Sequence, residues 1–147
     1  MPRIDPNHLP HQGGTTYPPE FAGAVAGRRK ASIAKPFALE DFGVSHVVLA
    51  PGAASSQRHW HEEEDELVVM LEGEAVLVDE DGRHSMRPGD IAVFPKNDAN
   101  GHHLINESEA ECRFVAIGRP PRGICHYADI DMIFADQRYT RKDGSVL

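Results

Sequence analysis

The sequence has little cysteine and no long apolar run. Only two cysteines, Cys112 and Cys125, occur among its 147 residues, too few for the disulfide framework of a small secreted domain. One of its longest apolar runs, residues 67–71, is far shorter than the ~20 residues of a membrane-spanning helix. The N-terminal residues are polar and proline-rich, unlike a secretory signal peptide. We therefore expect a cytoplasmic protein with reduced thiols and no membrane segment.

Positive charge is also scarce. The chain has 15 Lys and Arg against 23 Asp and Glu, a formal net charge of −8, which argues against binding of nucleic-acid backbones. The small basic run at residues 27–30 is interpreted as a solvated loop. The sequence has no nucleophile elbow, P-loop or glycine-rich dinucleotide motif, so serine hydrolysis and nucleotide chemistry are not supported.

Helical periodicity is missing as well. No segment keeps a 3.6-residue apolar repeat over three turns, and short β-branched runs alternate with Gly, Pro and Asp instead. Strands are expected near residues 44–51, 67–73, 74–82, 84–90, 91–95, 102–106 and 112–118. A single domain of this length with so many short strands favours an antiparallel sandwich or barrel.

Proline marks the boundaries of this domain. Five of the eleven prolines lie within the first 19 residues, so residues 1–36 are predicted to form an irregular N-terminal arm. The barrel is expected at residues 37–118. Residues 119–147 would form a C-terminal tail that packs on the barrel or on a partner subunit, with a hairpin or edge strand around Asp143 and Gly144.

Histidine, in contrast, is abundant, with nine residues. His59 and His61 are two apart, so a strand would place both on one face. Glu66 follows at the start of an apolar strand. It is preferred to the neighbouring Asp65 as a ligand, because its spacing from Gly73 fits better. His102, on a later strand, could enter the same interior. Imidazoles and a carboxylate that converge on one point predict a divalent-metal site.

These two segments resemble the paired motifs of the cupin superfamily. The first motif is matched by Gly52, His59, His61, Glu66 and Gly73, and the second by Gly89, Pro95, His102 and Asn106. The chain departs from the pattern by one extra residue before His59, by Asn97 in place of a glycine and by two extra residues before His102. Further segments resemble a group of small single-domain bacterial cupins, some of which carry the label sugar-phosphate isomerase-like.

The resemblance implies an all-β fold, a double-stranded β-helix (jelly-roll) cupin barrel with a divalent metal ion inside. Its usual ligands correspond to His59, His61, Glu66 and His102. Such a set suits Fe, Mn, Ni or Zn and leaves coordination positions open for substrate. The resemblance also implies a homodimer and a small-molecule ligand.

Three more residues are predicted to contact that ligand. Gln57 alternates onto the side of His59, His46 lies on an early strand, and Asn106 shares a face with His102. Two classes of function remain open. One is a metal-dependent enzyme on a small polar molecule, either a dioxygenase with an apolar pocket or an isomerase or epimerase with a general base such as His46 or Glu74. The other is a non-catalytic module that binds a sugar or carboxylate. The acidic residues 62–65 are expected to disfavour a large, highly anionic substrate at the mouth.

Overall fold

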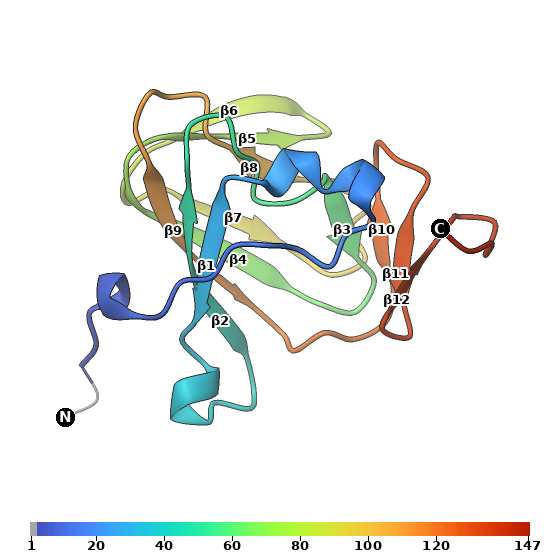
Figure 1. Ribbon diagram of the computed structural model, residues 1–147, viewed down its shortest axis with the longest axis horizontal. Helices are drawn as coiled ribbons and strands as arrows, with labels where there is room; N and C mark the ends of the chain where they lie inside the picture. Colours follow the sequence, from blue (N-terminus) through green and yellow to red (C-terminus); the bar gives the residue numbers. More distant parts are fainter. Residues whose placement is uncertain (1–2) are drawn as a thin grey trace.

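The computed structural model describes residues 3–147 as two facing layers of antiparallel strands (Figure 1). Helical structure in these residues is limited to four short 3-10 turns, η1 (Pro6–His8), η2 (Pro19–Phe21), η3 (Gly23–Val25) and η4 (Lys35–Phe37). Within the same residues there is no helix with the length and apolarity needed to cross a membrane. The all-β prediction is therefore confirmed.

The first layer is a five-stranded sheet with the order β1-β2-β9-β4-β7. Its strands are β1 (Arg28–Ser32), β2 (Gly43–Leu49), β9 (Cys112–Gly118), β4 (Glu66–Glu72) and β7 (Ile91–Phe94). The register places Val47 opposite Phe114 and Phe114 opposite Met70. Because side chains alternate along a strand, these three residues share the inner face of the sheet.

The second layer consists of a three-stranded and a four-stranded sheet. The first has the order β6-β5-β8, from β6 (Gly82–Met86), β5 (Ala75–Asp79) and β8 (His103–Ile105). The second has the order β12-β11-β10-β3, from β12 (Arg138–Thr140), β11 (Ile133–Ala135), β10 (Cys125–Tyr127) and β3 (His59–His61). A bridge between His59 and His102 joins the two sheets, so two of the predicted metal ligands lie at their junction.

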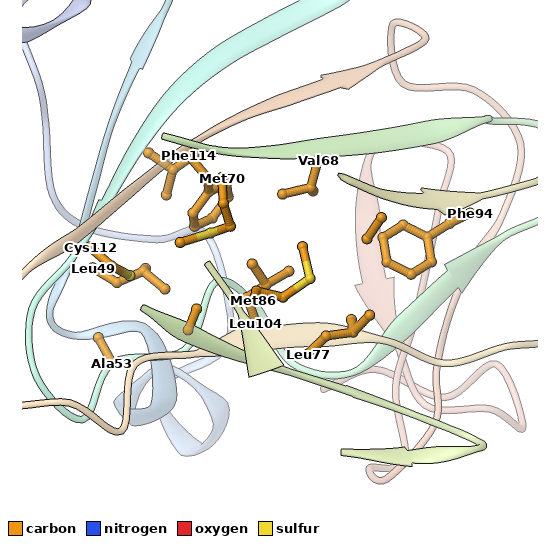
Figure 2. Packing of buried hydrophobic residues seen from close by; sticks show 13 residues of the cluster. Leu49, Ala53, Val68, Met70, Leu77, Met86, Phe94, Leu104, Cys112 and Phe114 are labelled. Carbon is orange, nitrogen blue, oxygen red and sulfur yellow. The ribbon is translucent and has the colours of Figure 1, made fainter. Parts of the chain in front are cut away.

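The space between the layers is filled by apolar side chains (Figure 2). Leu49, Met70, Cys112 and Phe114 are almost completely buried there. Full burial of such a side chain contributes about 1.5–3 kcal/mol. Gly73, which ends the first motif, has φ +72°, and a Cβ on it would lie 2.7 Å from the carbonyl oxygen of Glu111. The motif therefore needs glycine at this position for both backbone and packing reasons.

The first strand of the sheet lies ahead of residue 37, where we expected the barrel to begin. β1 was missed because its residues, RRKAS, show no apolar alternation. The N-terminal arm continues along this strand, since the backbone N–H and C=O groups of Gln12 and Lys30 bond to one another at 3.0 Å. The arm is therefore part of the sheet edge as well as a connecting segment.

The tail extends the second layer rather than leaving the barrel. β10, β11 and β12 continue the sheet beyond β3, and they pack with the arm in a second apolar cluster around Cys125, Tyr127 and Met132. The predicted turn near the C-terminus is present, because Thr140 pairs with Val146 across Gly144. Arm and tail thus close the barrel on the side of β3.

Candidate metal centre

Three histidines surround one carboxylate inside the barrel. Glu66 begins β4, His59 and His61 come from β3, and His102 directly precedes β8. The Nε2 atom of His102 lies 2.7 Å from Glu66 Oε2, that of His61 3.2 Å from Oε1, and that of His59 3.6 Å from Oε2. The structure thus brings together the four residues that the sequence motifs single out.

Strand alternation explains why Glu66, and not Asp65, points inward. Glu66 lies opposite Phe94 and Gly118 on the inner face of the five-stranded sheet. Asp65 instead accepts a hydrogen bond from the backbone N–H of Lys96 at 2.8 Å. It therefore fixes the loop beside β7 and leaves the interior to Glu66.

The hydrogen bonds of two rings define which nitrogen faces the centre. His59 Nδ1 lies 3.0 Å from the carbonyl oxygen of Gln57, and His102 Nδ1 lies 2.9 Å from that of Asn100. A carbonyl oxygen only accepts, so each Nδ1 carries its proton and donates it. In the neutral ring this leaves the Nε2 lone pair free and aimed at Glu66. Backbone carbonyls orient metal-binding histidines in the same way.

The charges at this centre are strongly coupled. Burial alone would raise the pKa of Glu66, but hydrogen bonds with His102, His59 and His61 hold this pKa far below its usual range. Burial would likewise lower the pKa of His61, yet contacts with Cys125, Glu64 and Glu66 raise it to about 12. Without a cation, His61 is therefore held as an imidazolium that pairs with the Glu66 carboxylate.

A divalent metal ion fits this donor set. The ligand atoms of His59, Glu66 and His102 all lie within 4.8 Å of one another, and nitrogen with carboxylate donors suits first-row transition metals. A cation among them would balance the Glu66 carboxylate in place of the His61 proton. Among the described side chains, the buried Nδ1 of His61 makes no hydrogen bond, although the Glu64 carboxylate lies 3.2 Å away.

Cys125 is a neighbour of the centre that sequence reasoning did not place there. It lies directly opposite His61 in the pairing of β10 with β3, and its sulfur forms a second potential donor group with His59 and His61. The sequence indicates only a plain thiol at Cys125, which lies outside both motifs. Only the pairing of the tail with β3 reveals this contact.

A cavity of about 340 Å³ opens beside the centre, between the two layers. His59, Glu66 and His102 form part of its wall. Further polar side chains line it from β1, β2 and the loop before β3, namely Arg28, Lys30, Ser45, Ser55 and Ser56. Its size is that of a small-molecule site.

Two of the predicted pocket residues face the N-terminal arm instead. His46 is on the outer face of β2, and its Nδ1 lies 2.7 Å from Nε2 of His11. Gln57 donates from Nε2 to the carbonyl oxygen of Phe21 at 2.9 Å. Neither His46 nor Gln57 is therefore among the residues that line the 340 Å³ cavity. Alternation groups residues on one face of a strand, but it does not say which face is the interior.

Asn106, the third predicted pocket residue, is also not on the cavity wall. It is fully buried, and its Nδ2 donates to the carbonyl oxygens of Leu49 and Ala110 at 2.9 and 2.8 Å. Its Oδ1 accepts from the backbone N–H of Ser108. Asn106 thus holds the loop between β8 and β9 against β2.

The acidic loop does not face the cavity either. Glu62 contacts His126 Nε2 at 2.7 Å, and Glu63 accepts from Arg122 Nε at 2.8 Å. Neither they nor Glu64 and Asp65 line the 340 Å³ cavity. Glu62 and Glu63 tie the loop to the tail, whereas Asp65 ties it to the segment after β7. Glu63 and Asp65 line an adjoining cleft that shares Glu66 with the cavity, so the expectation that they disfavour a large, highly anionic substrate at the mouth stays a prediction.

The fold and this centre define the class of protein. A model of the cupin domain matches residues 45–118, half of the chain, and the chain belongs to the cupin superfamily. None of the curated proteins matches the chain.

Solved structures show the same fold. A sugar phosphate isomerase of the cupin superfamily from Silicibacter pomeroyi is 40% identical, with a TM-score of 0.93 over 99% of this chain and 96% of that one. The polyketide cyclase RemF from Streptomyces resistomycificus is 19% identical, with a TM-score of 0.69 over 88% of this chain and 87% of its own. The second likeness bears on the fold alone.

Proposed function

We propose that the protein is a metal-dependent cupin that acts on a small polar molecule, with His59, His61, Glu66 and His102 as metal ligands. The observation that carries this proposal is the approach of three imidazole Nε2 atoms to one carboxylate, at 2.7–3.6 Å, in the wall of the 340 Å³ cavity. Fe, Mn, Ni and Zn all suit these ligands.

A bound metal ion would supply a Lewis acid that polarises a substrate oxygen. The chain's own residues perform the remaining tasks. The backbone carbonyls of Gln57 and Asn100 hold the rings of His59 and His102. The two layers exclude bulk water, and the cavity hydroxyls orient the ligand by hydrogen bonding.

Isomerase chemistry is favoured over dioxygenase chemistry. The cavity wall is mixed, because apolar side chains such as Val47, Phe94 and Phe114 form much of it, while serines and cationic side chains add polar groups that suit a polar substrate. The 40% identical relative is described as a sugar phosphate isomerase. The general bases considered from the sequence are not on the cavity wall, because His46 faces the arm and Glu74 lies on the surface near Arg87.

A non-catalytic binding module is the second candidate. The observation that favours it is the cavity lining, in which Glu66 is the single carboxylate among the described residues. As a metal ligand, Glu66 would not be free to accept a substrate proton. The site would then bind a small hydroxylated or carboxylated molecule without turnover.

Metal analysis of the purified protein tests the centre. We expect about one divalent ion per wild-type chain, and its loss in the variant with His59→Ala and His61→Ala, because two of four donors are removed. His84→Ala is the matched control, since His84 is an exposed histidine paired with Asp79. Equal metal content in the double variant and the control would refute the assignment.

Turnover is tested separately by proton NMR in D₂O. The metal-loaded protein should exchange the C–H proton next to the carbonyl of hydroxy-aldehydes and hydroxy-ketones, with and without a phosphate group. Exchange that needs the intact ligands supports the isomerase. Saturable binding without any exchange supports the binding module.

We also propose a homodimer formed through the outer face of the five-stranded sheet. Leu71, Ile91 and Val93 expose 43%, 60% and 63% of their surface there, and exposed apolar groups that gather on one face mark interaction sites. Val93→Glu should shift the mass measured by light scattering from two chains to one, while Val146→Glu, at an exposed tail residue, should not. A wild-type monomer would contradict this.

A further inference from the structure

We propose that Arg28 and Lys30 form an oxyanion subsite in the metal cavity and bind a phosphate or carboxylate group of the substrate. This inference rests on the proposed function, because it names the charged end of the molecule that the same cavity would hold. The substrate class is then a small hydroxylated molecule with one terminal oxyanion.

Strand β1 brings both side chains to the cavity. Arg28 and Lys30 are two residues apart, so they project to the same face of the sheet, and both line the cavity that His59, Glu66 and His102 also line. Arg29, between them, projects to the opposite face and pairs with Glu111 at 2.7 Å. The same strand therefore carries two cations on the cavity face, of which Arg28 is half-buried and Lys30 is exposed to solvent, and one cation on the opposite face.

The two cations on the cavity face have no counter-charge. Among the described residues, no carboxylate lies within 4.0 Å of either side chain, whereas Arg29 has one. Arg28 donates to the backbone carbonyl oxygens of Ser55 at 2.7 Å and Gly14 at 3.4 Å, which fixes its guanidinium but leaves its charge uncompensated. Burial, together with the positive charges of Arg28 and Lys35, lowers the pKa of Lys30. An oxyanion between the two would remove this repulsion.

The cavity is cationic in an acidic protein. The chain has a net charge of −8, yet the lining contains Arg28, Lys30 and Arg119 against the single carboxylate of Glu66. With a divalent metal on Glu66, the net charge of the groups that line the cavity would be positive. A cleft lined by one sign of charge concentrates ligands of the other sign.

Serine hydroxyls complete the subsite. Ser45, Ser55 and Ser56 line the cavity beside the two cations. Ser55 Oγ accepts from the backbone N–H of Leu104 at 2.9 Å, so its own proton is free to be donated to a ligand. Guanidinium, ammonium and hydroxyl donors together match the several acceptor oxygens of a phosphate or carboxylate.

Isothermal titration of the metal-free protein tests the subsite with two probes, inorganic phosphate and malonate. The tighter probe identifies the oxyanion. We expect Arg28→Gln and Lys30→Gln each to weaken its binding about tenfold or more, the usual effect of losing one charge-assisted hydrogen bond. Arg29→Gln is the matched control on the same strand and should bind as wild type does.

Further variants separate charge, folding and the metal centre. Arg28→Lys keeps the charge and should retain most of the affinity, and thermal melting shows whether each variant is folded. Metal content should stay unchanged in Arg28→Gln and Lys30→Gln. The His59→Ala, His61→Ala protein should still bind the anion, so loss of metal binding and loss of anion binding are distinguishable.

Three results would overturn the inference. The first is that the wild-type protein binds neither phosphate nor malonate. The second is that Lys30→Gln and Arg29→Gln bind the anion with equal affinity. The third is that anion binding is lost only when His59 and His61 are replaced. The last result would place the anion on the imidazolium groups of the metal-free centre instead of on β1.

Discussion

Glu66 has a dual role, because the same carboxylate that would bind a metal holds three imidazole rings together in its absence. It contacts the Nε2 atoms of His102, His61 and His59. A buried charge is stable only when it is paired. The metal-free centre is therefore an ion cluster whose contribution to stability depends on protonation.

The pH dependence of this cluster can be predicted from the raised pKa of His61, about 12. A histidine whose pKa is higher in the folded than in the unfolded state stabilises the fold below about pH 6.5, and this contribution is lost as pH rises toward the folded value. We expect the urea midpoint of the metal-free protein to fall between pH 7 and 9.5. Glu66→Gln should flatten this slope, and a slope equal to that of wild type would contradict the coupling.

For individual residues, the sequence predicts which side chains would bind the metal but not which side chains surround them. The choice of Glu66 over Asp65 follows from motif spacing, and the geometry agrees with it. Arg28 and Lys30 were interpreted as a solvated loop, since a basic run without apolar alternation gives no strand signal. Cys125 required a pairing between segments that lie 64 residues apart, which no local pattern encodes.

The N-terminal arm is the element whose role differs most from expectation. The Nε2 atom of its His11 lies 2.7 Å from His46 Nδ1, and the backbone of its Gln12 bonds to β1. Irregular structure was predicted from its prolines, but its docking depends on single contacts with distant strands. A sequence reveals that such a segment is irregular, not where it binds.

Acidification should loosen this arm. Burial, then the neighbouring charges of His11 and Arg113, lower the pKa of His46. A histidine with a lowered pKa favours the neutral ring in the folded state, so stability is lost as pH falls below about 6.5. We expect the protection factors of the amides in residues 11–14, which remove the intrinsic pH dependence of exchange, to be lower at pH 5 than at pH 7.5. His46→Phe should remove this difference, and equal protection at both pH values in the wild type would refute it.

The strands of the core allow a direct test of packing. Phe114 on β9 is almost completely buried between the layers, so Phe114→Ala should lower the free energy of unfolding by about 3–5 kcal/mol. Val146→Ala, at an exposed tail residue, should change it by less than about 0.5 kcal/mol. Urea unfolding of both variants measures the difference.

At the scale of the whole molecule, the metal centre connects the two layers. His59 and His61 come from the second layer, Glu66 comes from the first, and His102 stands at the junction of two sheets. A ligand that binds only the folded state stabilises it by mass action. At a metal concentration of 1,000 times Kd, the gain is about 4 kcal/mol.

Chelation should therefore lower the melting temperature of wild-type protein, and added metal should restore it. The double variant with His59→Ala and His61→Ala should not respond to either treatment. Differential scanning calorimetry with EDTA and then excess Ni²⁺ or Zn²⁺ measures the effect. A response of equal size in the double variant would show that the ion stabilises the protein elsewhere.

The two edges of the five-stranded sheet differ in a way that limits how copies can assemble. The edge at β1 is covered by the arm through Gln12 and Lys30, while the edge at β7 has no partner strand among residues 3–147. Open strand edges recruit further strands and promote fibres. With one edge covered, this sheet can extend in only one direction, and two copies joined edge to edge at β7 would use up the open edge of both. By covering the β1 edge, the arm therefore prevents open-ended polymerisation through this sheet.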